Sequence, residues 1–364
     1  MKICYLGDAN SIHTKKLCCF FRDKGYDVSV ISLNDGEIDG VKVYSMAMKI
    51  ENQGNSIAKI RYLKNIMKIK KIVNDIKPDI LHAHYATSYG LIGSLINYKP
   101  YIISVWGSDV YDFPKKSFIH EGLLKYNLKK ADLILSTSKV MADETKKYTS
   151  KEILITPFGV DIDKFKPNNI VRDKGEEFVI GTIKTLEEKY GIEYLIKAFQ
   201  VVKNRNVNLN IKLKIAGKGS KEKDLKKLCK ELNIENYVEF LGFINPNDVP
   251  NTFNSFDVAV FPSILDSESF GVAAVEAEAC GVPVIVSDVG GLMESTKPNY
   301  SSFVARRKDF NDLADKLEKV LLDNGLRESM GKNARKYVEE NYNYINNFNY
   351  INKIYLDLLD KKIQ

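Results

Sequence analysis

The sequence predicts an α/β protein made of two Rossmann-like domains that face each other across an interdomain cleft. Its length of 364 residues is more than one typical domain contains, and at about 150 residues per domain it favours two domains. Short β-rich runs alternate with helical patterns, which is typical of parallel sheets built from βαβ units. Between them, Gly, Pro, Asn and charged residues replace the hydrophobic period at 158–177 and mark a linker.

Six strands are predicted before the linker and six after it, with helices between them. The first six are KICYLG (2–7), DVSVIS (27–32), DILHAH (79–84), YIISVWG (101–107), LILST (133–137) and EILITP (152–157). The second six are FVIGTI (178–183), IKLKIAG (211–217), VEFLG (238–242), VAVFPS (258–263), PVIVSD (283–288) and SFVA (302–305). Since ligands of open parallel sheets bind beyond the carboxyl ends of the strands, functional residues are expected at those ends.

Composition narrows the function only slightly. Hydrophobic residues make up 44% and charged residues 28% of the chain, and no apolar run approaches the roughly 18 residues of a membrane span. A cytoplasmic protein is therefore expected. The five cysteines show no CxxC spacing, which argues against a zinc site or a disulfide framework. A net charge of +7 suits an anionic ligand, an anionic membrane face or nucleic acid, but no nucleic-acid-binding motif accompanies it.

The segment SESFGVAAVEAEACGVP holds the strongest chemical signal. Gly271 can bring the backbone close to a ligand, and a helix that starts at about Phe270 would offer unpaired N–H groups and a positive dipole end to a pyrophosphate. Glu268 would lie beside that phosphate and Glu276 about 9 Å along the axis, at 1.5 Å per residue. Two carboxylates so placed can accept hydrogen bonds from the two sugar rings of a nucleotide sugar. Glu278 has no such role and is expected to be exposed.

A family resemblance becomes specific around this motif. Residues 258–292 resemble the donor-binding signature of the retaining GT-B glycosyltransferases of family four, the glycogen-synthase-like group 1 enzymes. The resemblance continues through FGVDIDKF, KTLEEKYGIEYLIKAF, IAGKGSKEKDL and LRESMGKNARKYVEENY, and it reaches MKICYLGDANSIHTKK and DILHAHYATSYGLIG. It implies an N-terminal acceptor domain over 1–160, a C-terminal nucleotide-sugar domain over 161–342, and a helix at 343–364 that packs back on the first domain.

The same resemblance implies roles for the donor site. Glu268 matches the residue that orients the donor sugar, and Glu276 matches the one that holds the ribose hydroxyls. Phe270, Gly271 and Val272 match the donor-binding backbone that contacts the phosphates. Gly290 and Gly291 match the loop that faces the sugar. Gly217 and Gly219 match the lining of the nucleotide pocket. A GxG pair such as Gly217 and Gly219 is weak evidence on its own.

Lys184 and Lys189 match the basic pair that neutralises the leaving pyrophosphate in this family. The family usually has Arg at the position of Lys184. Lysine carries the charge without the planar guanidinium fork, so bidentate phosphate contact is lost there. Without the flanking match, both lysines would be read as part of a solvated helix face.

Trp106 and Asp109 form a second departure from the family. Many relatives have His where Trp106 stands, and that His contacts the donor sugar. Because the Trp ring N–H only donates hydrogen bonds, Asp109 is the candidate for a polar contact with donor or acceptor. The alternative is that Trp106 is a core aromatic and Asp109 caps the following turn.

Three histidines follow or lie in strands of the first domain. His13 is placed at a strand's carboxyl end, although an exposed or N-cap histidine explains it equally well. His82 and His84 share one face of a strand, and His84, nearer its end, is expected in the cleft. Their pairing resembles part of a zinc site, but a third ligand at suitable spacing is missing, so no metal is expected. The carboxylates of DID (161–163) match a linker element of the family rather than a metal site.

The segment 56–78 is predicted as a basic amphipathic helix. Its apolar positions include Ile60, Leu63, Met67 and Ile76, and the basic residues among them are Lys59, Arg61, Lys64, Lys68, Lys70 and Lys71. Such a helix can lie peripherally on an anionic membrane, here at its inner face. The alternative, that the stripe packs on the sheet and leaves the lysines solvated, is the commoner case.

Together these features predict a retaining, metal-independent glycosyltransferase. The donor is expected to be a nucleotide sugar, with UDP and a common hexose or N-acetylhexosamine favoured by the resemblance, and the acceptor a glycan or lipid-linked glycan. Two alternatives stay open: a catalytically silent GT-B subunit that binds a sugar nucleotide or a partner protein, and a GT-B epimerase or phosphorylase.

Overall fold

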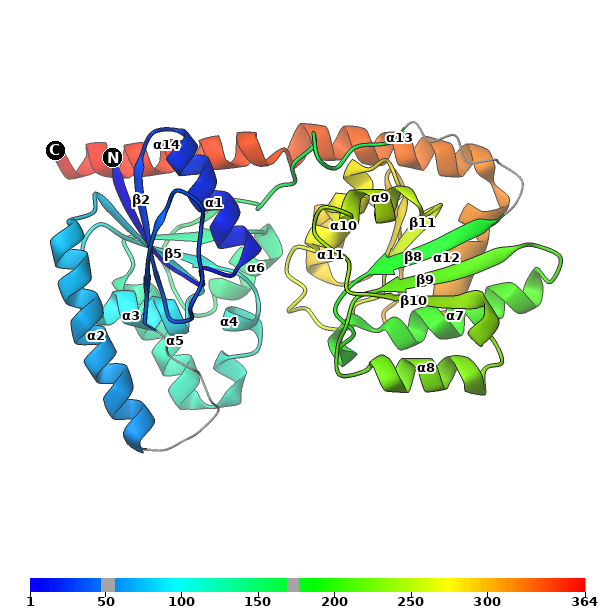
Figure 1. The fold of residues 1–364 in the computed structure, drawn as a ribbon, viewed down its shortest axis with the longest axis horizontal. Coiled ribbons are helices and arrows are strands. Elements are labelled where there is room, and N and C mark those ends of the chain that lie inside the picture. Colours follow the sequence, from blue (N-terminus) through cyan, green and yellow to red (C-terminus); the bar gives the residue numbers. More distant parts are fainter. Residues whose placement is uncertain (47–55, 169–176, 364) are drawn as a thin grey trace. The chain divides into compact units, whose positions relative to one another are not determined.

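The protein folds into two α/β units, in a computed structural model that describes residues 1–46, 56–168 and 177–363. One unit contains Met1–Phe158 together with Ile345–Gln364, and the other contains Gly159–Tyr344. Each unit has one sheet of parallel strands with helices on both faces (Figure 1). This architecture confirms the predicted class of two Rossmann-like domains.

The first sheet has seven strands in the order β3-β2-β1-β4-β5-β6-β7, and all neighbours are parallel. Its strands are β1 (Lys2–Leu6), β2 (Asp27–Ser32), β3 (Lys42–Ser45), β4 (Ile80–His84), β5 (Tyr101–Val105), β6 (Leu133–Ser136) and β7 (Ile153–Ile155). Six of them match predicted strands. The seventh, β3, is an edge strand without a fully buried residue. Its apolar pattern is therefore too weak to predict a strand.

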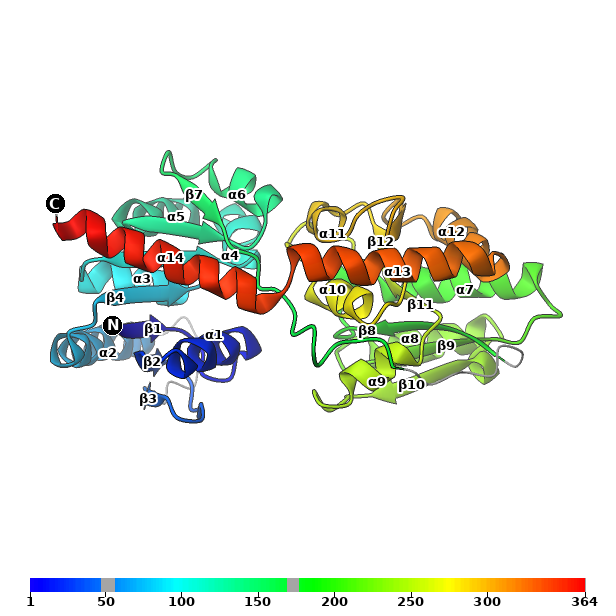
Figure 2. The same cartoon turned by 90° about the horizontal axis from the view of Figure 1, so that it is seen from above.

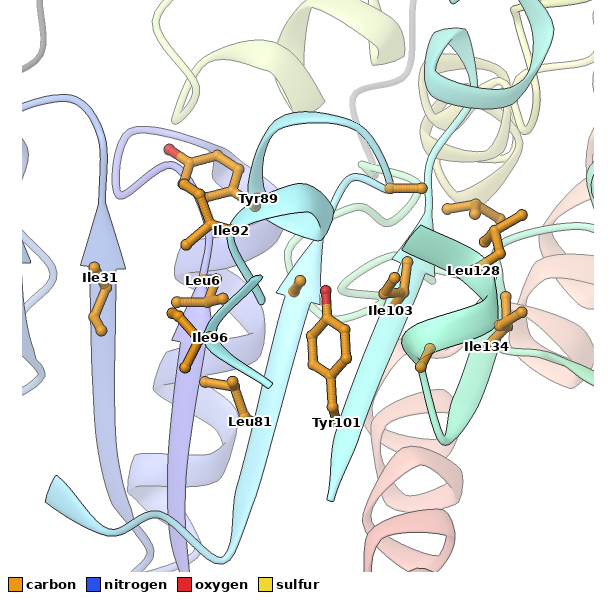
Figure 3. Packing of buried hydrophobic residues seen from close by; sticks show 14 of the residues in the cluster. Leu6, Ile31, Leu81, Tyr89, Ile92, Ile96, Tyr101, Ile103, Leu128 and Ile134 are labelled. Carbon is orange, nitrogen blue, oxygen red and sulfur yellow. The ribbon is translucent and has the colours of Figure 1, made fainter. Parts of the chain in front are cut away.

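Helices cover both faces of this sheet. They are α1 (Ile12–Asp23), α2 (Ser56–Ile76), α3 (Ser88–Ile96), α4 (Ser108–Tyr111), the short 3₁₀ helix η1 (Pro114–Lys116), α5 (Phe118–Lys130), α6 (Lys139–Thr145) and α14 (Tyr344–Ile363). Figures 1 and 2 show α1 and α14 on one face and α2, α3 and α5 on the other. On the latter face, aliphatic side chains of the strands interlock with those of α3 and α5 in a buried core (Figure 3).

Helix α2 packs on the sheet through one side of its second half. Ile69 and Val73 are buried in the core, with Ile72 and Ile76 packed against it. Met67, predicted on the apolar stripe, is 76% exposed. The side chains of Lys59, Ile60, Arg61, Leu63 and Lys64 lie outside what the structure describes, so their places on the helix stay predictions. In the described ranges, no helix has the length and apolarity to cross a membrane.

The second sheet has six parallel strands in the order β10-β9-β8-β11-β12-β13. They are β8 (Phe178–Ile183), β9 (Ile211–Ala216), β10 (Val238–Gly242), β11 (Val258–Phe261), β12 (Val284–Ser287) and β13 (Ser302–Ala305). The helices are η2 (Glu188–Tyr190), α7 (Ile192–Arg205), α8 (Glu222–Glu231), η3 (Glu235–Tyr237), α9 (Val249–Asn254), α10 (Val272–Ala279), α11 (Gly290–Ser295), α12 (Phe310–Leu322) and α13 (Asn324–Asn341).

The last helix, α14, belongs to the core of the first unit. The Tyr355 hydroxyl hydrogen-bonds the Tyr5 hydroxyl at 3.2 Å and His82 Nδ1 at 2.6 Å, and all three side chains are buried. The ring of Phe348 packs edge-on against Phe20 at 5.4 Å between centroids. A buried polar network and aromatic contacts therefore hold the end of the chain on the sheet that its beginning forms.

Candidate functional site

The predicted donor residues of the second unit gather at one edge of its sheet. Lys184 follows β8, Gly217 follows β9, Glu268 and Gly271 lie between β11 and α10, and Gly290 begins α11 just after β12. Because parallel strands present their carboxyl ends at one edge, topology alone brings these loops together.

The start of α10 requires a glycine. Gly271 is the N-cap residue in the left-handed conformation, with φ of 71°, and a Cβ there would lie 2.4 Å from Leu292 Cδ2. Helix α10 begins at Val272, two residues later than predicted, so Glu276 lies only about 6 Å along its axis. Phe270 is buried and packs edge-on against Tyr342. The first N–H groups of α10 have no acceptor within the helix, which suits an anion.

The adjoining loops approach one another backbone to backbone. A Cβ on Gly217 would lie 1.9 Å from the Lys184 carbonyl oxygen, and one on Gly219 would lie 2.3 Å from that of Leu186. A Cβ on Gly291 would likewise lie 2.3 Å from the Glu268 carbonyl oxygen. These glycines therefore set the packing of the loops that carry Lys184 and Glu268.

Lys184 and Glu268 form an ion pair at this edge. Lys184 Nζ lies 2.9 Å from Glu268 Oε1, and the two side chains are only 15% and 11% exposed. The residue predicted to orient the donor sugar thus neutralises, in this structure, one of the two lysines predicted to face the pyrophosphate.

Both lysines also contact one aromatic ring. Lys184 Nζ lies 4.5 Å and Lys189 Nζ 4.7 Å from the centroid of the Tyr190 ring. These distances are within the range of cation–π attraction. Tyr190 was not predicted as a site residue, although it stands directly between Lys189 and Gly191.

The two acidic residues of α10 differ in burial. Glu276 is half-buried, whereas Glu278 is fully buried. The expectation that Glu278 is exposed is therefore wrong. Helix α10 is covered by α9, α11, α13 and the sheet, so even its charged position faces protein. Burial raises the pKa of the Glu278 carboxyl well above its ordinary value.

The first unit has a small cavity at the carboxyl edge of its own sheet. Its volume is about 20 Å³, enough for one water molecule. The lining residues are His13, Leu17, His82, His84, Ser104, Trp106, Thr137, Thr156, Pro157, Phe158, Phe348 and Ile351. The structure thus brings together the three predicted cleft residues, His13, His84 and Trp106.

Aromatic rings form much of this cavity wall. The His13 ring stacks on Phe158 at 3.9 Å between centroids, and Trp106 lies 4.7 Å from His84 and 5.8 Å from His13. Trp106 is partly buried, so it serves as a wall of the cavity rather than as an enclosed core residue. Phe158 had no recognisable signal in the sequence, because it lies in the segment assigned to the linker.

The histidines of the cavity favour the neutral form. Burial lowers the pKa of His13 to about 4, with Lys16 adding to the effect, and lowers that of His82 to about 3. Burial lowers the pKa of His84 well below its ordinary value, and the neighbouring His82 and His13 contribute. The described residues that line the cavity include no lysine, arginine or carboxylate, so the cavity suits uncharged hydroxyl groups.

Hydroxyl groups form hydrogen bonds with most ring nitrogens of His82 and His84. Ser104 bonds His82 Nε2 at 2.7 Å, and Thr14 bonds His84 Nδ1 at 3.1 Å. In the described part of the chain, His84 Nε2 and the Thr137 hydroxyl lack a partner, and both residues line the cavity. No group of three or more His, Cys, Asp or Glu side chains within that part is arranged to hold a metal ion.

Asp109 serves the backbone around the cavity. Its carboxylate is fully buried and accepts N–H hydrogen bonds from Ala86 at 2.8 Å, Trp106 at 3.1 Å and Gly107 at 2.8 Å. Burial raises the pKa of Asp109, and these N–H donors oppose that rise. The carboxylate therefore ties the loop after β5 to the loop after β4, and the N–H groups that it bonds precede it rather than belong to the following turn.

Known proteins resemble the chain over nearly its whole length. An uncharacterised glycosyltransferase of Methanocaldococcus jannaschii is 30% identical over 92% of this chain and 91% of its own. The capsular polysaccharide biosynthesis glycosyltransferase CapM of Staphylococcus aureus is 27% identical, covering 89% and 88%. The UDP-Gal:α-D-GlcNAc-diphosphoundecaprenol α-1,3-galactosyltransferase of Escherichia coli is 23% identical, covering 93% and 90%.

Solved structures share the fold at lower identity. Sucrose-phosphate synthase of Thermosynechococcus elongatus matches with a TM-score of 0.85 and 19% identity, over 99% of this chain and 100% of its own. HepE of Anabaena, solved with UDP-glucose, matches with a TM-score of 0.77 and 19% identity, over 97% and 99%. These matches show the GT-B fold.

Two family models cover most of the chain. Residues 163–337 match the glycosyl transferases group 1, and residues 2–138 match the glycosyl transferase 4-like family. The protein is an enzyme that transfers glycosyl groups. It belongs to the group 1 glycosyltransferases of family four, which have the GT-B fold, use nucleotide-sugar donors and retain anomeric configuration.

Proposed function

We propose that the enzyme transfers a hexose or N-acetylhexosamine from a UDP-sugar to a glycan or lipid-linked glycan. The observation that carries this proposal is the gathering of Glu268, Lys184 and Lys189 at the sheet edge where α10 begins. The names of two relatives support the acceptor class, since one acts in capsular polysaccharide biosynthesis and the other on a diphosphoundecaprenol-linked sugar. The HepE complex with UDP-glucose supports the donor.

In this proposal the donor diphosphate lies at the N-terminus of α10. The N–H groups after Gly271 and the ammonium groups of Lys184 and Lys189 hold its negative charge. Glu268 accepts hydrogen bonds from the transferred sugar, and Glu276, on the same helix, accepts them from the ribose. Gly217, Gly219 and Gly291 let the loops that carry Lys184 and Glu268 pack closely, and Gly290 begins α11 at the same edge of the sheet.

Donor and acceptor roles are divided between the units. We assign the donor to the second unit and the acceptor to the first, whose cavity offers neutral histidines and aromatic rings. The cavity itself has room for only one water molecule, so a neutral sugar would lie against its outer side and contact the partly buried His13 and Trp106. The buried His84 would reach that sugar only through a water molecule in the cavity. Asp109 would act indirectly, because it fixes the backbone on either side of Trp106.

The transfer step needs no covalent nucleophile from the protein. The bond between the anomeric carbon and the diphosphate oxygen breaks while the acceptor oxygen bonds the same face of that carbon. The acceptor proton passes to the departing phosphate oxygen. The protein contributes by positioning the reactants and by stabilising the charge that develops on the diphosphate.

A panel of nucleotide sugars and free nucleotides tests the donor. A ligand that binds only the native state raises the melting temperature, so UDP and one UDP-sugar should raise it more than GDP, ADP or CMP forms. Product analysis with that donor and a series of polyprenyl-diphosphate sugars or oligosaccharides then identifies the acceptor. If the donor is epimerised and no glycosylated product forms, the proposed transfer activity is wrong and the enzyme is an epimerase.

Peripheral membrane binding through α2 is a second part of the proposal. The outer side of its second half carries exposed Met67, Lys68, Lys70 and Lys71, a combination that suits an anionic lipid surface. We expect cosedimentation with vesicles that contain anionic lipid and not with neutral ones. Equal sedimentation with both, or with neither, would rule out this surface role.

A further inference from the structure

Tyr190 contacts both lysines of the proposed diphosphate site. The two ammonium nitrogens lie 4.5 and 4.7 Å from its ring centroid, and both distances are within the roughly 6 Å limit of cation–π attraction. One ring therefore contacts both ammonium groups, and that of Lys184 is also paired with Glu268. A diphosphate, which carries charge on both phosphoryl groups, is the kind of ligand that these two ammonium groups fit.

The ring itself is anchored by the fold. Tyr190 ends η2 and packs against the hydrophobic core of the second unit. The next residue, Gly191, has a left-handed φ of 62°, and a Cβ there would lie 2.1 Å from the Pro262 carbonyl oxygen. On the other side, the Lys189 carbonyl accepts an N–H hydrogen bond from Ile264 at 2.9 Å. The backbone on both sides of Tyr190 is thus fixed against the segment that follows β11.

We propose that Tyr190 is a positioning residue that holds Lys184 and Lys189 in place for the diphosphate of the donor. Lysine side chains are long and have many rotamers, so an ammonium group that must meet a phosphate gains from a fixed neighbour. The ring supplies that neighbour without neutralising the charge, unlike a carboxylate. This inference rests on the proposed function, since it takes the two lysines to be the diphosphate ligands.

Calorimetric titration with UDP and with inorganic diphosphate tests the role without an acceptor. Tyr190→Leu should weaken the binding of both ligands about tenfold, the loss expected for two cation–π contacts. Tyr190→Phe keeps the ring and should bind within about twofold of the unchanged protein. The matched control is Tyr237→Leu, because Lys203 Nζ lies 4.7 Å from the Tyr237 ring in the same unit, outside the site. This control should not change binding.

Each outcome has a distinct meaning. Binding by Tyr190→Leu equal to that of the unchanged protein, while Lys189→Met binds weakly, overturns the role of Tyr190 alone. Equal losses in Tyr190→Phe and Tyr190→Leu also overturn it, because the hydroxyl and not the ring would then matter. If the unchanged protein binds neither ligand, the proposed function fails first. Melting temperatures identify a folding defect, and in that case Tyr190→Trp, which restores a ring, must recover binding for the proposal to stand.

Discussion

Lys184 and Glu268 are joined by a 2.9 Å ion pair whose side chains are 15% and 11% exposed. A carboxylate at this position competes with any phosphate for the ammonium group. In the proposed donor site, a diphosphate would have to displace or share this contact, and the two partners of the pair would then be available to different parts of the donor.

Glu268→Gln should separate nucleotide binding from catalysis. Removal of the competing charge should tighten the binding of UDP, which lacks the sugar, about two- to fivefold, the strength of a partly exposed ion pair. Sugar transfer should nevertheless fall about 10²-fold, because a preorganised partner of the reacting sugar is lost. Calorimetry and a product assay measure the two effects. Glu177→Gln, which breaks the surface pair with Lys212, is the control. Weaker UDP binding in Glu268→Gln would contradict competition.

Lys189→Ala should slow turnover about 10²-fold or more at saturating donor, as expected when one charge partner of the leaving group is removed. Initial rates over a range of donor concentrations separate this effect from an effect on affinity. Lys197→Ala is a suitable control, since Lys197 also lies over a tyrosine, Tyr194, on α7. An unchanged maximal rate would exclude Lys189 from stabilising the departing diphosphate.

Gly271→Ala should damage the start of α10. The added Cβ meets Leu292 at 2.4 Å, and the left-handed backbone costs a non-glycine residue roughly 1–2 kcal/mol. We expect a lower melting temperature and weaker UDP binding, measured on one preparation. Gly122→Ala is the control, because a Cβ there has no neighbour within 4 Å and Ala favours the helix interior. Normal UDP binding by Gly271→Ala would argue against a ligand at this helix end.

Glu278→Gln should stabilise the second unit increasingly as the pH rises. The buried carboxyl has a raised pKa, so the native state keeps its proton while the unfolded state loses it above an ordinary value of about 4.5. The unchanged protein therefore loses stability from about that pH up to the raised pKa, by about 1.4 kcal/mol per pH unit, whereas the amide does not titrate.

Thermal melts at pH 5, 6, 7 and 8 measure this difference. The gap between Glu278→Gln and the unchanged protein should widen with pH, by about 3–5 °C per unit for a domain of this size. Glu239→Gln changes an exposed carboxylate and should give a constant gap. A gap for Glu278→Gln that is equally constant would mean that the carboxyl is ionised in the native state.

Much of this molecule follows from local sequence patterns. Strands with several buried aliphatic residues, such as β4 and β12, were predicted within a residue or two, and the position of Glu268 beside a helix start follows from the strand-Gly-helix order. Edge strand β3 lacked that signal because its side chains are only half-buried. The burial of individual helix positions was harder to predict. Met67 was expected on the apolar stripe and is exposed, whereas Glu278 was expected to be exposed and is buried.

The error at Glu278 has a physical origin in the packing of α10. Residue polarity predicts exposure only when a helix has one solvent face, and α10 has almost none, since it is packed between other helices and the sheet. Ring contacts, in turn, have no sequence periodicity. Tyr190 contacts Lys184, which is 6 positions away, and Phe158 stacks on His13, which is 145 positions away. The chemistry of charged groups was therefore easier to predict than the aromatic surroundings that orient them.

The hydrogen bond between Tyr5 and Tyr355 joins residues 350 positions apart. During translation, the first unit is released from the ribosome long before α14, so the part of the sheet that this helix covers stays exposed beside α1. The second unit, by contrast, is complete once Tyr344 has emerged. The first unit is therefore begun first but completed last. A chain that stops short of α14 would expose Tyr5, His82 and Phe20 to chaperones and proteases.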